Sequence, residues 1–275
     1  MVKTKKIKEN KKKINKAKSK KISKKISRKN KRLKYTKKAR SKKTDIRIVD
    51  VPFSKSKSAG TDATLGNIQL HYQKYSNVFD FITKFNNKNT CFIDDLFLNL
   101  EINEEEMSLY PMEKISFNNR ISECMKSKKR FIPIILNLIT NEGNHANILL
   151  IDKKDKLVEL YEPHGSRPDK SVLGGIKGAY NKKINEVKRF WRKFLPDFKV
   201  INVVDLKRGT HFQMEYDPDN HSGFCVTWSL LFIHYRILNP DIKLKDLMNY
   251  ISRKITTNKL LQYARHIEDS IKNKI

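Results

Sequence analysis

The first 43 residues carry most of the excess charge of this chain, which limits where a folded core can form. They contain 20 Lys, 3 Arg and one acidic residue, Glu9, a net charge of +22 out of +30 for the 275-residue sequence. Such a segment has few apolar side chains to bury and its charges repel, so we expect it to be disordered in isolation. The other 232 residues hold 36 basic and 28 acidic side chains, which is typical of a mildly basic globular protein.

The charge of residues 1–43 also predicts a class of partner. Lys and Arg side chains that neutralise phosphates release counterions, so this tail is suited to nonspecific binding of DNA or another polyanion. A nuclear import signal and a solubilising tail are the alternatives. No apolar segment follows the basic start, so we expect no secretory signal. The longest near-apolar run, 131–139, falls far short of the roughly 20 residues of a membrane span, so we expect no membrane partner.

The chain has three cysteines, Cys91, Cys124 and Cys225. An odd number of cysteines in a chain this long does not suggest a disulfide framework, so we expect free thiols in a reducing compartment. We expect Cys91 and Cys124 to be ordinary residues on helix faces. No CxxC pair and no Cys/His ligand spacing occurs, so we predict no structural zinc and no other cofactor.

The pattern along the chain predicts a folded domain at 67–275, joined to the tail by a linker at 44–66. Within this domain we predict an N-terminal helical lobe (67–128), a central core (129–240) and C-terminal helices (241–275). In the helical lobe, residues 71–85 and 89–107 have apolar side chains at helical spacing.

The central core carries the strand signals. Short apolar runs bounded by turn residues predict strands, and long amphipathic runs predict helices. The predicted strands are 130–140, 145–152, 156–162 and 198–206, and the predicted helices are 179–196, a helix from about Cys225 to 239, 241–254 and 258–272. Strands in the middle of the chain with helices on both sides predict an α+β architecture with a mostly antiparallel central sheet.

Two strand ends bring a histidine and a carboxylate together. If 145–152 and 156–162 form a hairpin, the residue numbers of two residues that face each other across it sum to about 309. This register places Glu162 opposite Asn147. A shift of two residues would pair Glu162 with His145 directly. In both registers the imidazole and the carboxylate are neighbours, as a carboxylate needs to be to orient a histidine and stabilise its protonated form. Asn147 is the alternative orienting group.

Cys225 lies where a turn-rich segment gives way to the apolar run VTWSLLFIHYRIL. At the start of a helix, the macrodipole and the unpaired N–H groups favour the thiolate over the thiol. The same N–H groups can stabilise an oxyanion. The alternative is that Cys225 packs as a small apolar residue, as buried cysteines commonly do.

Taken together, these motifs resemble the adenain and Ulp/SUMO-protease clan of cysteine peptidases. They are His145 with Asn147 at a strand start, ELYEPHG at 159–165, and GFC before an apolar helix, in the order His, acid, Cys that this clan uses. The resemblance covers roughly residues 130–240 and is strongest to Ulp-like thiol proteases of large DNA viruses. It implies an adenain-like, papain-like protease fold.

The resemblance also implies a role for each motif residue. Cys225 would be the nucleophile, His145 the general base that then protonates the leaving amine, and Glu162 the group that orients His145. The clan places a glutamine shortly before the cysteine to help form the oxyanion hole. Gln213 is the candidate for this role, although it lies farther from Cys225 than the clan's spacing, and Asn220 is the alternative.

The activity implied by the resemblance is a thiol endopeptidase acting on peptide or isopeptide bonds of a protein substrate. The substrate would be a viral precursor or a protein that carries a ubiquitin-like modifier, in a virion or inside a host cell. The basic tail favours the first, because a packaged protease could use the genome as a guide. Two other functions stay open: a YopJ-like acyltransferase, which uses the same residue types, and a non-enzymatic basic nucleic-acid-binding protein.

Overall fold

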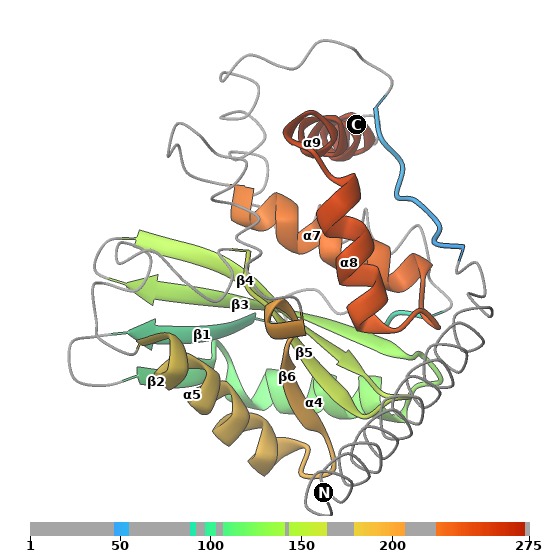
Figure 1. Ribbon diagram of the computed structural model, residues 1–275. Coiled ribbons are helices and arrows are strands. Elements are labelled where there is room, and N and C mark those ends of the chain that lie inside the picture. Colours follow the sequence, from blue (N-terminus) through green and yellow to red (C-terminus); the bar gives the residue numbers. More distant parts are fainter. Residues whose placement is uncertain are drawn as a thin grey trace, which may run out of the picture. The chain divides into compact units, whose positions relative to one another are not determined.

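A mixed β-sheet forms the centre of the computed structural model (Figure 1). The structure describes residues 47–54, 89–91, 97–102, 107–140, 143–163, 179–206 and 224–272. The chain divides into the units Met1–Arg47 and Ile48–Ile275, and all elements below belong to the second. The predicted tail, 1–43, lies outside the described residues.

Six strands of the described residues form the sheet, in the order β2-β1-β3-β4-β5-β6. The strands are β1 (Phe97–Ile102), β2 (Met107–Pro111), β3 (Phe131–Thr140), β4 (Gly143–Asp152), β5 (Leu157–Tyr161) and β6 (Lys199–Asn202). The pairs β1–β2, β3–β4 and β4–β5 are antiparallel, and β1–β3 and β5–β6 are parallel. The predicted α+β class with a mostly antiparallel sheet is therefore confirmed.

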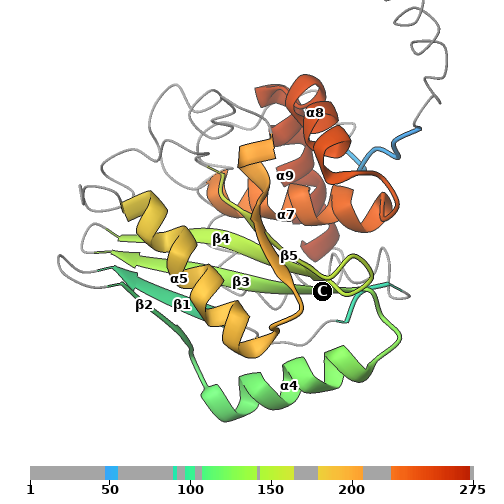
Figure 2. The same cartoon turned by 60° about the horizontal axis from the view of Figure 1, so that its bottom comes forward.

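Helices cover both faces of this sheet (Figures 1 and 2). They are α4 (Lys114–Lys126) and α5 (Ala179–Phe194) on one face, and α7 (Phe224–Leu238), α8 (Leu244–Lys254) and α9 (Thr257–Lys272) on the other. In β3, Phe131 and Ile135 belong to the core under α7–α9, while Ile132 and Ile134 belong to the core under α4 and α5. Burial on both faces explains why this strand is almost continuously apolar. None of the described helices combines the length and apolar character that a bilayer crossing requires.

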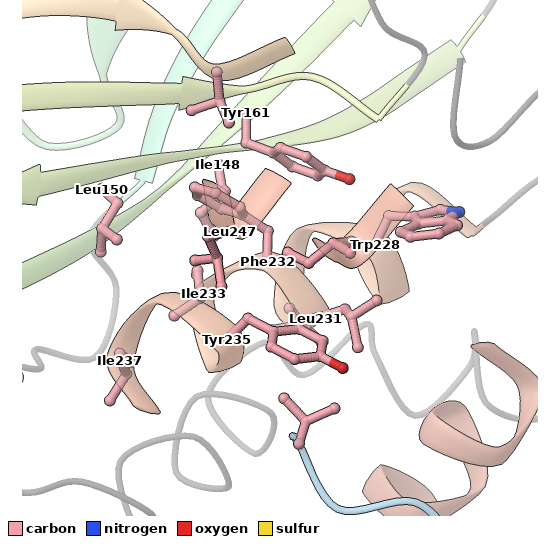
Figure 3. Close-up of a cluster of buried hydrophobic side chains, with 14 of the residues drawn as sticks. Ile148, Leu150, Tyr161, Trp228, Leu231, Phe232, Ile233, Tyr235, Ile237 and Leu247 are labelled. Carbon is pink, nitrogen blue, oxygen red and sulfur yellow. The ribbon is translucent and has the colours of Figure 1, made fainter. Parts of the chain in front are cut away.

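Helix α7 lies between the sheet and the other C-terminal helices, and its sequence is mostly apolar, with a few buried polar side chains that include Arg236. Among its described side chains, only Val226 and Leu238 are partly exposed. The ring of Tyr161, at the end of β5, reaches α7 and stacks on Phe232 with centroids 4.6 Å apart (Figure 3). A helix with so few polar side chains and no polar face is typical of one that is enclosed in this way.

The predicted helix over 89–107 is wrong at residues 97–102, which form β1. Leu98, Leu100 and Ile102 are buried, whereas Asn99 and Glu101 are more exposed. This alternation has the two-residue period of a strand, and the parallel pairing with β3 satisfies the backbone. Strands β1 and β2 thus extend the sheet of the predicted core into the predicted helical lobe. The segment 71–85 lies outside the described residues.

The expectation that all cysteines are free thiols is also wrong, because Cys91 and Cys124 form a disulfide. Their Cα atoms lie 5.5 Å apart, and the bond joins the residue after the Thr90–Phe131 bridge to α4. The predicted helix position is wrong for Cys91, which lies outside the described helices, whereas Cys124 lies on α4 as predicted. An odd number of cysteines allows one disulfide and one free thiol, and Cys225 is the free one.

Two other predicted segments differ from the structure. The predicted strand 198–206 ends at Asn202, and the residues that follow form a 3-10 turn, η1 (Val203–Leu206). Residues 48–54, within the predicted linker, pack against the C-terminal helices: Val51 is buried, and Asp50 accepts hydrogen bonds from the hydroxyls of Tyr235 and Tyr250.

A buried ion cluster fixes the C-terminal end of α7 against the β4–β5 hairpin. The Arg236 guanidinium donates to Glu159 at 2.9 Å and to Asp152 at 3.0 Å, and all three side chains are almost fully buried. Arg130 donates to the same Asp152 oxygen at 2.7 Å. Burial raises the pKa of Glu159 although Arg236 lowers it, so this carboxylate depends on its cation.

Replacing Arg236 by Met is expected to lower the free energy of unfolding by about 3–5 kcal/mol, because it leaves the buried Glu159 carboxylate without its ion-pair partner. Chemical denaturation measures this change. As a control, Arg189→Ala breaks an exposed ion pair with Glu186 and is expected to cost at most about 1 kcal/mol. Similar small losses in both variants would contradict the role given to Arg236.

Candidate active site

Cys225 is the second residue of α7 and is only 8% exposed. The backbone N–H groups of Val226 and Ala146 donate hydrogen bonds to its sulfur. The first N–H belongs to the first turn of the helix, where backbone donors have no intrahelical acceptor. The second belongs to β4, so the thiol lies where the start of α7 meets this strand.

His145, near the start of β4, joins the thiol to a carboxylate. Its Nε2 lies 2.8 Å from Glu162 Oε1, and both side chains are buried. The imidazole also forms a hydrogen bond with the Cys225 side chain. Because Nε2 is engaged with Glu162, we assign this second bond to Nδ1.

Glu162 follows the last residue of β5, and the register of the hairpin decides its position. Tyr161 pairs with Ile148, so the residue numbers of each pair add up to 309, the first of the two registers considered. Glu162 comes next and lies opposite Asn147. Its Oε2 accepts a hydrogen bond from the ammonium group of Lys183 on α5. The hydrogen-bonding groups around Asn147 require its amide nitrogen to face Glu162. In this orientation the nitrogen donates to Oε2 at 2.5 Å and to Oε1 at 3.3 Å. Asn147 thus supports the carboxylate that contacts His145.

These contacts form a series that crosses the sheet. Side chains alternate along β5: Tyr161 packs with α7, while Leu160 belongs to the core of the α5 face. Glu162 continues the alternation of Leu160 and meets Lys183 from α5. The series therefore runs from α7 (Cys225) through β4 (His145) and the end of β5 to α5 on the opposite face.

The electrostatic surroundings favour charge separation between the thiol and the imidazole. Burial raises the pKa of Cys225, but His145 and the two backbone N–H groups outweigh this, so the thiol pKa is lowered. Burial lowers the pKa of His145, but Glu162 and Cys225 outweigh this and raise it to about 9. Both shifts favour a thiolate beside an imidazolium over a neutral pair.

The structure brings together three of the predicted site residues, Cys225, His145 and Glu162. The two candidates for the oxyanion hole, Gln213 and Asn220, lie outside the described residues. Among the described residues, no group of three or more His, Cys, Asp or Glu side chains has an arrangement that could hold a metal ion.

Lys183, which is fully buried, was not among the predicted site residues. A signal was present, because Lys183 lies on the apolar stripe of α5 with Ile184, Val187 and Trp191, where a lysine is unusual. Sequence alone did not show which acid it would meet.

Comparison with known proteins gives partial likenesses. No protein-family model matches the sequence. The chain is 24% identical over 180 residues to an ankyrin repeat protein of Acanthamoeba polyphaga mimivirus, a match that spans 56% of this chain and 23% of that protein.

Among solved structures, a protease of ASFV is 18% identical, with a TM-score of 0.30 over 52% of this chain and 44% of the viral protein. The SUMO protease Ulp1, with its catalytic cysteine oxidised, is 12% identical, with a TM-score of 0.33 over 71% of this chain and 76% of Ulp1. These overlaps are too limited to assign an activity, so the function proposed below is based on the side chains of this chain.

We expect iodoacetamide to alkylate Cys225 at pH values below the ordinary thiol pKa of about 8.5, because the thiolate fraction is set by the lowered pKa. His145→Ala removes the neighbouring cation and should move the inflection of rate against pH upward. Mass spectrometry under non-reducing conditions should show one labelled cysteine, since Cys91 and Cys124 are bonded to each other. An inflection at or above the ordinary value in the native protein would contradict the ion pair.

Proposed function

We propose that this chain is a cysteine peptidase in which Cys225 is the nucleophile, His145 the general acid and base, and Glu162 the group that orients His145. The observation that carries the proposal is the buried series of hydrogen bonds from the thiol through the imidazole to the carboxylate. A thiol that served only for packing would need no such partners, since buried cysteines commonly pack among apolar side chains.

In the proposed reaction, the Cys225 thiolate attacks the carbonyl carbon of the scissile amide, which forms a C–S bond and an oxyanion. Backbone N–H groups of the first turn of α7 supply donors for that oxyanion. His145 then gives its Nδ1 proton to the leaving amine as the C–N bond breaks, which leaves a thioester. Neutral His145 takes a proton from water, the resulting hydroxide attacks the thioester, and the thiolate and imidazolium form again.

Glu162 has two tasks in this cycle. It accepts the Nε2 proton of His145, which fixes the ring with Nδ1 toward the sulfur. Its negative charge also stabilises the imidazolium that must persist until the amine leaves. Loss of the carboxylate therefore affects both the orientation and the protonation of the base.

We infer a protein substrate, either a viral precursor or a protein that carries a ubiquitin-like modifier, from the motifs around His145, Glu162 and Cys225. A virion or host-cell location stays a prediction. Binding of DNA or another polyanion by residues 1–43 also stays a prediction, because this segment lies outside the described residues.

The proposal is tested with vinyl sulfone derivatives of ubiquitin and SUMO and with a peptide library, both followed by mass spectrometry. The native chain should be captured at Cys225 by a probe or should cleave peptides, without acetyl-CoA. Cys225→Ser and His145→Ala should each lose turnover on the order of a thousandfold or more while remaining folded.

Arg189→Ala serves as the control, because Arg189 is exposed on α5 and is expected to leave turnover unchanged. Cleavage that persists in Cys225→Ser would contradict the role of the nucleophile. Acyl transfer that requires acetyl-CoA, with no hydrolysis of any substrate, would assign the chain to the acyltransferases instead.

A further inference from the structure

Lys183 is a fully buried lysine on a helix whose other lysine side chains are at least partly exposed. Its neighbour Lys182 is exposed, as expected for a helix that covers a sheet. An ammonium group is costly to bury unless it is paired and hydrogen-bonded. The position of Lys183 on the apolar stripe of α5 therefore calls for a partner under the helix.

That partner is Glu162, and Lys183 contacts one of its two carboxylate oxygens. Lys183 donates to Oε2, while the other oxygen, Oε1, lies 2.8 Å from His145 Nε2. The carboxylate thus lies between an ammonium group on one side and the imidazole on the other. Along the series from α7 to α5, the groups Cys225, His145, Glu162 and Lys183 alternate in charge when the thiol is ionised, and the four charges cancel.

We propose that Lys183 is a positioning residue of this active site, which keeps Glu162 ionised and turned toward His145 so that a buried thiolate–imidazolium pair can form. This inference rests on the proposed function. Burial alone favours the neutral form of a carboxyl group, and a neutral carboxyl stabilises an imidazolium much less than a carboxylate does. The ammonium group opposes the effect of burial, and its hydrogen bond to Oε2 leaves Oε1 directed at the imidazole.

The other titratable group described next to this series is Tyr161, from β5. Burial and the nearby Glu162 raise its pKa well above the ordinary value, so its hydroxyl stays neutral over the working range. The charges described around the thiol therefore come from His145 on β4, Glu162 after β5 and Lys183 on α5.

The test compares Lys183→Met with Lys182→Met, which removes the same charge from an exposed position of the same helix. The readout is the rate of Cys225 alkylation against pH, which needs no substrate. Lys183→Met should move the inflection of the Cys225 alkylation rate upward by about one pH unit, whereas Lys182→Met should leave this inflection unchanged. At a pH below both inflections, the alkylation rate should fall roughly three- to tenfold, because a higher thiol pKa lowers the thiolate fraction but makes the thiolate more nucleophilic.

A double-mutant cycle separates action through Glu162 from other effects. In a Glu162→Gln background, Lys183 has no carboxylate to hold, so adding Lys183→Met should raise the inflection no further. If Lys183→Met lowers the melting temperature but leaves the inflection of the native chain unchanged, Lys183 is a structural residue only and the inference is overturned. The inference also fails if the shift is the same in both backgrounds.

Should Lys183→Met not fold, infrared difference spectra of the native chain against Glu162→Gln provide a second test. Glu162 should show a carboxylate band from about pH 5 to pH 8, above the ordinary glutamate pKa of about 4.3. A protonated carboxyl band at neutral pH would overturn the inference. If the native chain itself lacks an acidified thiol, the proposed function fails; if the thiol is acidified but insensitive to Lys183→Met, only the role of Lys183 fails.

Discussion

The Glu162 carboxylate is the group on which the candidate active site depends, because elements from the sheet and from one helical layer meet at it. It is fully buried, and such a charge is tolerated only when its oxygens are hydrogen-bonded. Lys183 from α5, His145 from β4 and Asn147 from the same strand meet this need. The β4–β5 register places the carboxylate among them. A slip of one residue would turn Glu162 to the opposite face of the sheet, away from Lys183.

Helix α7 carries Cys225, the proposed nucleophile, and contacts at the middle and at the C-terminal end of the helix hold it against the hairpin. At its C-terminal end, Arg236 is bound to Glu159 and Asp152 of the hairpin. In its middle, Phe232 stacks on Tyr161, the residue before Glu162 (Figure 3). The hairpin that carries His145 and Glu162 thus also holds the helix that carries Cys225. Such mutual support is what the proposed active site needs, because catalysis tolerates only small deviations in the positions of its side chains.

The sequence was sufficient to predict the parts of this structure that are determined locally. The apolar runs of β3, β4 and β5 and the short turn between the last two strands predicted the hairpin and left two registers open, one of which the structure adopts. Motif order then predicted that Cys225, His145 and Glu162 would meet. The features that were missed depend on contacts between distant segments. Strand β1 has an alternating pattern over only six residues, and its pairing with β3, some 40 residues later, decides its conformation.

The disulfide and the buried lysine were missed for the same reason. Cys91 and Cys124 are 33 residues apart, and no local pattern shows that they are neighbours. A lysine in an amphipathic helix is normally exposed, and Lys183 is buried because an acid 21 residues earlier in the chain lies under α5. Local patterns indicate which side chains can do chemistry, whereas the tertiary fold determines how those side chains are supported.

The most direct test of the thiolate–imidazolium pair is a titration of His145 by nitrogen-15 NMR of its ring. We predict that both ring nitrogens carry protons at neutral pH, that the imidazolium loses its proton at a pH near 9, and that alkylation of Cys225 lowers this pKa by removing the thiolate charge. An imidazole that titrates near its ordinary value of 6.5, unchanged when Cys225 is alkylated, would contradict the ion pair and the function built on it.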